Sequence, residues 1–238
     1  LGVIMGYTDL IQEDPSDPAD VVYNNSQVMK ASERAKEMVN QILMLSRKQE
    51  DSMGPVKLVK IVNEVKGFLR NAIPSTIDIQ IEIKGEISNI FGNATQINQV
   101  LMNLATNAAH AMKDKGGVLT IWLNQVLIDS DQGNALGLVP GKFIKLSVID
   151  TGCGISPSHI SRIFEPYFTT KPEGEGTGLG LAVIYNIVQN HSGGIQVYSE
   201  PGNGTRFDVY LPTIGELEML PVKKKTSIAV NGVGKYIL

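Results

Sequence analysis

The sequence predicts an α+β protein, in which a mixed sheet carries helices on one face and is preceded by an α-helical hairpin. Two observations lead to this prediction. Between residues 52 and 212, a few helical stretches and about five strand-like stretches follow one another without strict alternation, which favours helices stacked on one side of a mixed sheet. Residues 17–51 instead repeat apolar side chains every seven positions, a pattern typical of helices packed side by side.

Composition excludes several classes of protein. The chain has 238 residues, of which 42% are hydrophobic and 19% charged, and its net charge of −3 offers no general attraction to nucleic acid or anionic lipid. A single cysteine, Cys153, excludes an internal disulfide framework, fits a reducing and therefore cytoplasmic compartment, and is interpreted as a small filler. The sequence has no run of about 18 apolar residues, so we expect no membrane contact by this chain, although a longer parent protein could be membrane-tethered.

The N-terminal region has the pattern of a helical hairpin. Asp17 is a suitable N-cap and Pro18 suits the first helical position. The interpretations left open are a helix packed on its own domain and, favoured here, the second arm of a hairpin whose first arm is residues 1–13 and which dimerises into a four-helix bundle. The heptad positions are Val21, Val28, Ala35 and Ile42, with Asn24, Ala31, Met38 and Leu45 as the second series.

Both ends of the sequence indicate a piece of a longer protein. Leu1 begins inside an apolar helical run, and the chain ends on an apolar "KYIL". We therefore expect a truncated helical hairpin at 1–51, an α/β domain at 52–212, and a linker at 213–238.

The elements of the central domain follow from periodicity. We predict helices near 57–71 and 93–114 and after residue 180, a loop at 127–141, and strands at 77–83, 118–126, 142–150, 193–200 and 205–212. In the second helix, Asn93 and Gln96 have capping-box spacing. Its apolar stripe, expected to face the sheet, is Ile97, Leu101, Leu104, Ala108 and Met112.

The same helix carries a second, polar stripe. Its members recur at steps of three and four residues, so they project in one direction. A solvated face is the alternative, but such faces usually carry Lys and Glu, whereas uncharged amides suit fixed hydrogen bonds and metal ligation. The stripe consists of Gln99, Asn103, Asn107, His110 and Asp114.

Two further segments hold candidate binding residues. Asp150 ends a predicted strand, and Gly152 and Gly154 follow in a turn, where a carboxylate can accept a hydrogen bond from an amine and glycines admit a flat ring; Asp-x-Gly is also common turn chemistry. The stretch 164–168 then supplies Phe164, Tyr167 and Phe168 without regular periodicity, either as core anchors or as the hinge of a mobile lid.

A glycine-rich stretch, "GEGTGLGLAV" at 174–183, leads directly into a helical pattern. It lacks the Gly-Lys-Ser/Thr ending of a Walker loop, and its glycines do not have dinucleotide-binding spacing. The mechanism that remains is a flexible backbone that feeds a helix N-terminus, where the helix dipole favours an anion such as phosphate.

Taken in order, these four segments resemble the nucleotide-binding boxes of bacterial sensor histidine kinases. The closing stretch "PGNGTRFDVYLP" and the hairpin end "LMLSRKQ" are also similar, so that the resemblance covers residues 1–212. It implies the GHKL (Bergerat) ATP-binding fold joined to a helical dimerisation and phosphotransfer hairpin. The implied activity is transfer of the ATP γ-phosphoryl group to a histidine, for relay to an aspartate of a response regulator.

The resemblance also implies a set of site residues. Asn107 would coordinate Mg²⁺ on the ATP phosphates with support from Asn103, and Asp150 would accept from the adenine amine. Glycines 152 and 154 would shape the adenine pocket, while glycines 176, 178 and 180 would wrap the phosphates beneath a lid at about 156–177. His110 stands where the family often has a basic residue, and Thr205 would line the far side. The expected nucleotide-binding residues are Asn103, Asn107, His110, Asp150, Gly152, Gly154, Ile155, Phe164, Gly176, Thr177, Gly178, Leu179, Gly180, Leu181 and Thr205.

The sequence departs from the family at its ends. The phosphoacceptor histidine of the family lies in a motif that would precede Leu1, so we expect no catalytic acceptor in this chain and no self-phosphorylation on the usual residue. "KYIL" resembles the first strand of a receiver domain, which would make the parent a hybrid kinase. Expected partners are a second copy, through the hairpin, and a response regulator or receiver domain.

Two other functions compete with this prediction. Other ATPases of the same fold resemble this chain but place a glutamate general base where Asn103 stands, and an amide cannot take a proton from water. The other alternative is a nucleotide-sensing or dimerising module without catalysis.

Overall fold

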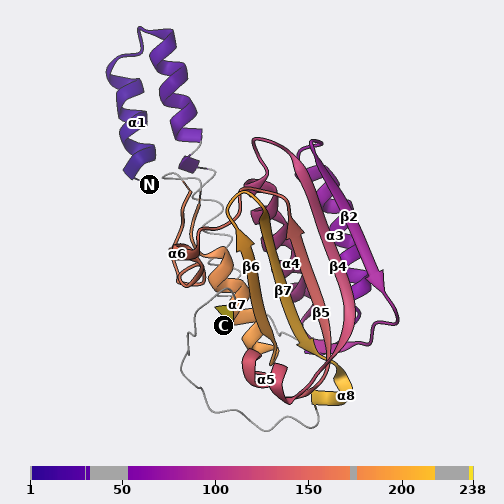
Figure 1. Cartoon of the computed structure of the whole chain (residues 1–238). Helices are drawn as coiled ribbons and strands as arrows, with labels where there is room; N and C mark the ends of the chain where they lie inside the picture. Colours follow the sequence, from indigo (N-terminus) through magenta and orange to yellow (C-terminus); the bar gives the residue numbers. More distant parts are fainter. Residues whose placement is uncertain (1, 30, 33–52, 172–175, 218–235, 238) are drawn as a thin grey trace. The chain divides into compact units, whose positions relative to one another are not determined.

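A computed structural model of the chain describes residues 2–29, 31–32, 53–171, 176–217 and 236–237 (Figure 1). These residues fall into two compact units. The first comprises Leu1–Glu50 with Thr169–Thr177, and the second comprises Asp51–Phe168 with Gly178–Leu238. Each unit is described by itself.

The first unit contains a helical hairpin. Helix α1 (Gly2–Glu13) is followed by a turn and by helical residues 18–29. The turn is held by Asp14 Oδ1, which accepts from the Ser16 N–H at 3.1 Å, and the second helix by Asp17 Oδ1, which accepts from the Ala19 N–H at 2.8 Å. Asp17 therefore caps the helix as predicted. The heptad residues from Ala35 onward lie outside the described residues.

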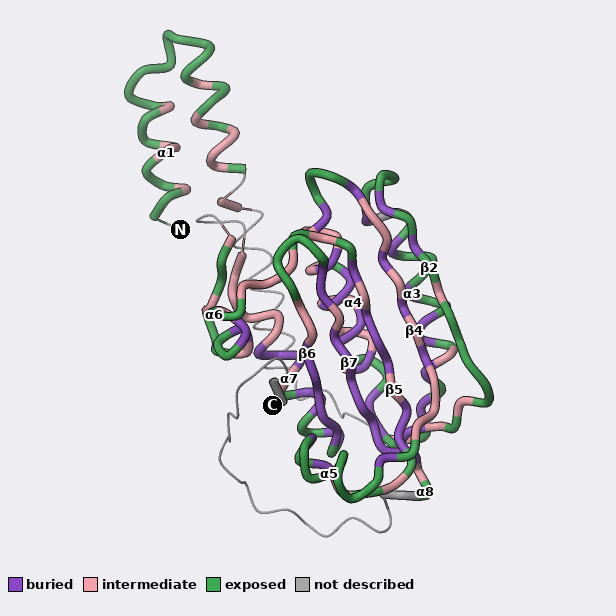
Figure 2. Tube along the Cα trace, in the orientation of Figure 1, coloured by how far each residue is buried: buried purple, intermediate pink, exposed green. Residues whose placement is uncertain are grey.

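Apolar side chains remain on the outside of this hairpin. No residue of α1 is buried, and the heptad positions Val21 and Val28 are half-buried. The hairpin alone therefore leaves much of its apolar surface uncovered, as its predominantly exposed trace in Figure 2 shows. Among the described residues of this unit, the exposed large apolar side chains are Val3, Met5, Leu10, Val22, Tyr23 and Met29.

The second unit is built on a mixed sheet in the order β2-β4-β5-β7-β6-β8. Strand β2 pairs in parallel with β4, and every other neighbouring pair is antiparallel. The strands are β2 (Ile77–Lys84), β4 (Gly117–Ile128), β5 (Gly141–Asp150), β6 (Gly194–Glu200), β7 (Gly204–Pro212) and β8 (Tyr236–Ile237). A separate antiparallel pair joins β1 (Gly54–Val56) to β3 (Ile90–Gly92).

Three helices cover one face of this sheet: α3 (Leu58–Ala72), α4 (Ala94–Ala111) and α7 (Gly180–Asn190). Their apolar faces form one core with alternate residues of the strands, including Ile121, Leu146 and Val209, each of which is 0% exposed. This core appears as the buried stretches of the strands in Figure 2. The predicted sheet-facing stripe of α4, from Ile97 to Met112, is buried throughout, so that prediction is confirmed. This arrangement, with helices on one face of a mixed sheet, confirms the predicted α+β class.

The predicted loop at 127–141 is wrong in one respect, because it contains helix α5 (Ser130–Leu136). Asp129 caps this helix by accepting from the Gln132 N–H at 2.8 Å, and Gly137 ends it with a left-handed φ of 65°. Leu136 packs with Phe143 and Tyr210 in a second, smaller core. The helix was not predicted because its sequence is short and mostly polar, and it is stabilised by tertiary packing.

Two other boundaries differ from the prediction. Helix α4 ends at Ala111 instead of continuing to 114, so Asp114 lies in the following turn and is not part of the helical polar stripe. After β7 the chain forms α8 (Ile214–Leu217), and β8 pairs with β6. The two residues of β8 do not test the receiver-domain prediction, which stays a prediction. Among the described helices, none is both long and apolar enough to cross a membrane.

Candidate nucleotide site

The N-terminus of α4 is anchored by the capping interaction that the sequence predicted. Asn93 precedes the helix, and its side chain accepts from the Gln96 N–H at 2.9 Å. With the apolar stripe of α4 facing the sheet, the polar residues Asn103, Asn107 and His110 lie half-buried along another side of the helix. The amides are therefore neither core residues nor members of a fully solvated face.

Asp150 is a buried carboxylate at the end of β5, with 5% of its surface exposed. Its Oδ1 accepts two backbone hydrogen bonds, from Gly152 N–H at 2.8 Å and from Thr205 N–H at 3.2 Å. Burial raises the pKa of the Asp150 carboxyl above its usual value, and these two donors offset that effect only in part. In the described part of the chain, no hydrogen bond reaches Oδ2, so one oxygen holds the turn and the other remains available to a ligand.

The turn after Asp150 requires its glycines for close approach between chain segments. A Cβ on Gly152 would lie 2.7 Å from the Ala111 Cβ at the end of α4, and one on Gly154, whose φ is +70°, would clash with the Glu200 carbonyl. The Cys153 N–H also donates to the Ala111 carbonyl at 3.1 Å. The turn is thus fastened to the C-terminus of α4, which brings the Asp150 turn and the amide helix together. The side chain of Cys153 is exposed, so its interpretation as a filler is wrong.

Ser199 is a site residue that the sequence analysis missed. Its hydroxyl accepts from the Ile155 N–H at 2.8 Å and donates to the Gly204 carbonyl at 3.0 Å, and it lies 2.9 Å from the Thr205 hydroxyl. It therefore ties the residue after the glycine turn to β7. Ser199 and Thr205 are paired across β6 and β7, and only that strand register brings them together.

Of the two alternatives for the aromatic segment, core anchoring is confirmed for Phe164 and Phe168, and the lid hinge stays a prediction. Phe164 packs on the core, with its ring 5.7 Å from that of Tyr185 on α7, and Phe168 is also partly buried against the core. Tyr167 is 76% exposed and has a left-handed φ of 68°. Its N–H donates to the Gly178 carbonyl at 2.9 Å, and a Cβ on Gly178 would clash with the Tyr167 backbone. Phe164 is thus an anchor, and Tyr167 and Gly178 are in direct backbone contact.

The glycine-rich segment leads into α7 as expected. The helix begins at Gly180 after Leu179, and no side chain caps its N-terminus. The Asn103 side-chain amide donates a long hydrogen bond of 3.5 Å to the Gly180 carbonyl, so the structure brings the amide helix and this loop together. Leu181 packs against the core. Gly176 and Thr177 belong to the first unit, which is described by itself, so their place in the site stays a prediction.

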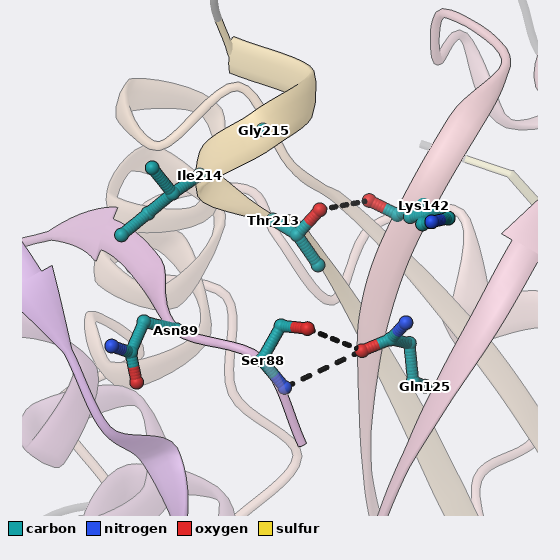
Figure 3. A pocket seen from close by; sticks show the side chains of 7 residues that line it. All are labelled: Ser88, Asn89, Gln125, Lys142, Thr213, Ile214 and Gly215. Atoms are coloured by element: carbon teal, nitrogen blue, oxygen red, sulfur yellow. Dashed lines mark hydrogen bonds between the residues drawn. The ribbon is translucent and has the colours of Figure 1, made fainter. Parts of the chain in front are cut away.

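A cavity of about 600 Å³ lies away from these residues (Figure 3). It includes Lys142, at the other end of β5 from Asp150, and none of the predicted site residues. In it, Gln125 Oε1 accepts from the Ser88 hydroxyl at 2.8 Å, and the Thr213 hydroxyl donates to the Lys142 carbonyl at 3.2 Å. These four polar groups are therefore paired with one another. Within the described ranges, no cluster of three or more His, Cys, Asp or Glu side chains forms a metal site.

A buried carboxylate beside an amide-bearing helix and a glycine-rich helix start, on a mixed sheet, defines an ATP-binding domain of the GHKL type. Residues 92–214 match the family described as histidine kinase-, DNA gyrase B- and HSP90-like ATPases. This match spans more than half of the 238 residues. The chain therefore belongs to that family.

Its curated relatives are sensor kinases. The chain is 33% identical over 214 residues to the signal transduction histidine-protein kinase AtoS of Escherichia coli, covering 89% of this chain and 32% of AtoS. It is 32% identical over 203 residues to the sensor kinase CckA of Brucella abortus, covering 85% of this chain and 21% of CckA. It thus spans about a fifth to a third of the length of these two relatives.

Solved structures agree with the fold. The catalytic domain of histidine kinase ThkA is 27% identical and superposes with a TM-score of 0.56, covering 68% of this chain and 96% of that domain. ThkA in complex with the response regulator protein TrrA superposes with a TM-score of 0.67 at 24% identity, covering 90% of this chain and 57% of that chain.

Proposed function

We propose that this chain is the catalytic part of a sensor histidine kinase, which binds Mg²⁺-ATP and transfers the γ-phosphoryl group to a histidine for relay to a response-regulator aspartate. The observation that carries the proposal is the state of Asp150. It is buried and held through one oxygen by two backbone donors, while its second oxygen stays available, in a turn fastened to the amide helix. A buried carboxylate with an unused oxygen suits an amine donor such as that of adenine.

The adenine end of the proposed site surrounds Asp150. Oδ2 accepts from the exocyclic amine, and the backbone at Gly152 and Gly154 forms one wall. Ile155 and Thr205 lie close by, because the Ser199 hydroxyl links the two residues. Thr205 is 5% exposed, so its hydroxyl lies in a poorly solvated position in which hydrogen bonds discriminate strongly between ligands.

The phosphate end lies toward Asn107 and the start of α7. The Asn107 amide oxygen is a hard ligand of the kind that Mg²⁺ prefers, and Asn103 links α4 to Gly180 at 3.5 Å. When bound, the metal would neutralise charge on the phosphates. Gly178, Leu179 and Gly180 present backbone at a helix N-terminus, where the dipole favours an anion. His110, Phe164 and Leu181 complete the proposed set within the second unit, and Gly176 and Thr177, which belong to the first unit, stay predictions.

Phosphoryl transfer fits these groups better than hydrolysis does. The residue one turn before Asn107 is Asn103, whose amide cannot act as a general base toward water. Transfer to a histidine needs mainly positioning and charge neutralisation, which amides, backbone donors and a metal can supply.

The roles of the other regions of the chain are proposed from the resemblance to the same family. Residues 1–51 serve as a dimerisation and phosphotransfer hairpin, 52–212 as the catalytic domain, and 213–238 as a linker toward a receiver domain. The exposed apolar side chains of the hairpin support pairing with a second copy. The described structure places His110 on α4, His159 on α6 (Pro157–Ile160) and His191 after α7, and none of these is in the hairpin. In this proposal none of these three histidines is the acceptor, and the chain acts in the cytoplasm.

Nucleotide binding is tested first, by calorimetric titration with ATP in the presence and absence of Mg²⁺. Replacing Asn107 by Ala should weaken binding and abolish its dependence on Mg²⁺. Gln99→Ala is the matched control, because Gln99 is half-buried on the same helix and lies two turns before Asn107. Equal binding by wild type and Asn107→Ala in Mg²⁺ would refute the metal role, and an absence of ATP binding by the wild type would refute the function.

Transfer is tested by adding a separately produced kinase hairpin that contains its phosphoacceptor histidine but no catalytic domain. With γ-labelled ATP, we expect acid-labile, base-stable label on that hairpin and none on this chain alone. Strong label of this type on the isolated chain would contradict the proposed source of the acceptor.

A further inference from the structure

His191 is a buried histidine that lies outside the proposed nucleotide site. It follows the last residue of α7 and is 3% exposed. Its Nε2 accepts from the Asn93 N–H at 3.0 Å, and its Nδ1 lies 2.8 Å from the Ile187 carbonyl. The imidazole therefore bridges the C-terminal turn of α7 to the residue that caps α4.

These contacts determine the protonation state of the ring in this arrangement. A backbone N–H can only donate, so Nε2 must be the acceptor and carry no proton. The neighbouring carbonyl can only accept, so Nδ1 carries the proton and donates. The bridge thus requires the neutral Nδ1–H tautomer.

The bridge lies at one end of the contact between α4 and α7, and the hydrogen bond from Asn103 to Gly180 lies at the other. Asn93 and Asn103 are ten residues apart, and Gly180 and His191 are eleven apart. At about 1.5 Å per residue these spans are about 15 Å and about 16.5 Å, so two antiparallel helices are joined at matched positions. The two helices are in contact with one another and lie on the same side of the sheet (Figure 1).

We propose that His191 is a positioning residue for the nucleotide site, because it sets the register between α4 and α7. This inference rests on the proposed function, since α4 carries Asn103 and Asn107 and α7 begins with the proposed phosphate-binding glycines. Without the bridge, α7 can shift along α4, and the Gly180 backbone then moves relative to the Asn103 amide. His191 acts through this helix pair and does not itself touch the nucleotide.

Gly92 provides an independent test of the same bridge. A Cβ at this position would lie 2.6 Å from His191 Cδ2 and 2.8 Å from Nε2. Gly92 is not among the glycines with positive φ, so alanine there adds crowding against the ring without backbone strain. Gly92→Ala should therefore displace the imidazole and reproduce the loss of His191.

The experiment measures the ATP affinity of each variant at a temperature at which all variants are folded. The melting temperature of each variant is measured separately. His191→Phe keeps a ring but loses both hydrogen bonds, and should bind ATP about three- to tenfold more weakly. His191→Gln can place an amide oxygen near the position of Nε2 and should bind within about twofold of wild type. Ile121→Val, in the buried part of β4, is the control for lost stability and should keep wild-type affinity.

Crowding is tested in two backgrounds. Gly92→Ala should weaken ATP binding in the wild type but not in His191→Ala, where the smaller side chain leaves room. Wild-type affinity in a folded His191→Phe, or an equal effect of Gly92→Ala in both backgrounds, would overturn the inference. A wild-type chain that does not bind ATP would instead overturn the proposed function.

Discussion

Replacement of Asp150 by asparagine should separate nucleotide binding from stability. Asn has the same shape as Asp, but its two terminal atoms differ, one being an acceptor and the other a donor. Oδ1 of Asp150 accepts from the N–H groups of Gly152 and Thr205, so the oxygen of Asn must occupy that position. The NH₂ group is then forced into the position of Oδ2, where an amine of the ligand would meet a second donor.

The size of the effect follows from the loss of one charged acceptor. A hydrogen bond to a charged group contributes about 1.5 to 3 kcal/mol, and the opposed donors add to this loss. ATP should therefore bind at least about ten- to 150-fold more weakly to Asp150→Asn. Titration calorimetry measures this directly. Asp129→Asn is the control for the change in net charge, because Asp129 caps α5 and Asn caps equally well.

The same substitution should weaken ATP binding but leave the stability of the fold unchanged or increase it. Burial raises the pKa of Asp150, so the folded state binds the proton more tightly than the unfolded state does, and the charged carboxylate costs stability at neutral pH. Asp150→Asn removes that cost and should unfold at the same or a higher temperature than wild type at pH 7. The difference in unfolding temperature between Asp150→Asn and wild type should disappear as pH falls below the usual pKa of aspartate, about 3.9, where both side chains are neutral. Affinity within threefold of wild type, or a clear loss of stability at pH 7, would refute the assignment.

Further predictions concern the backbone and the hairpin. Ser192 has a left-handed φ of 54°, so Ser192→Gly should raise the free energy of unfolding by about 1 kcal/mol in urea titrations, and a decrease would show that its side chain matters more. Gly154→Ala, with φ of +70° and a clash against the Glu200 carbonyl, should lower it by about 2 kcal/mol or more and also abolish ATP binding; an unchanged melting curve would contradict the geometry. Val3 and Val22 are 58% and 70% exposed, so if the proposed dimer forms through the hairpin, changing both to Glu should convert it to monomer in light scattering, whereas Thr106→Glu on α4 should not.

Local sequence patterns predicted most elements of the central domain. The alternating isoleucines of β2 and the apolar stripe of α4 identify elements whose buried faces have a clear period, and the Asn93 cap is a local interaction within four residues. The α5 helix escaped prediction because seven residues with few apolar side chains have no readable period. Its stability depends on the packing of Leu136 against Phe143 and Tyr210, and Tyr210 is distant in sequence from the other two residues.

The residues of the candidate site also divide into those that the sequence could identify and those that only the structure revealed. The amides, Asp150 and the glycines could be selected from the sequence because each is unusual where it stands: amides on a helix face that would otherwise carry Lys and Glu, and glycines that forgo packing. Ser199 and His191 could not be selected in this way. A serine in a strand and a histidine at a helix end are common, and their roles depend on partners 44 and 98 residues away.

The sequence by itself therefore determined the class of fold and selected the chemical groups of the candidate site, since both depend on residue type and short-range spacing. Tertiary structure alone decided which oxygen of Asp150 is used, which glycines serve chain packing, and how α4 and α7 are aligned. The physical reason is that hydrogen bonds and close contacts depend on distances within a few tenths of an ångström. Such distances arise only when strand register and helix packing bring remote residues together.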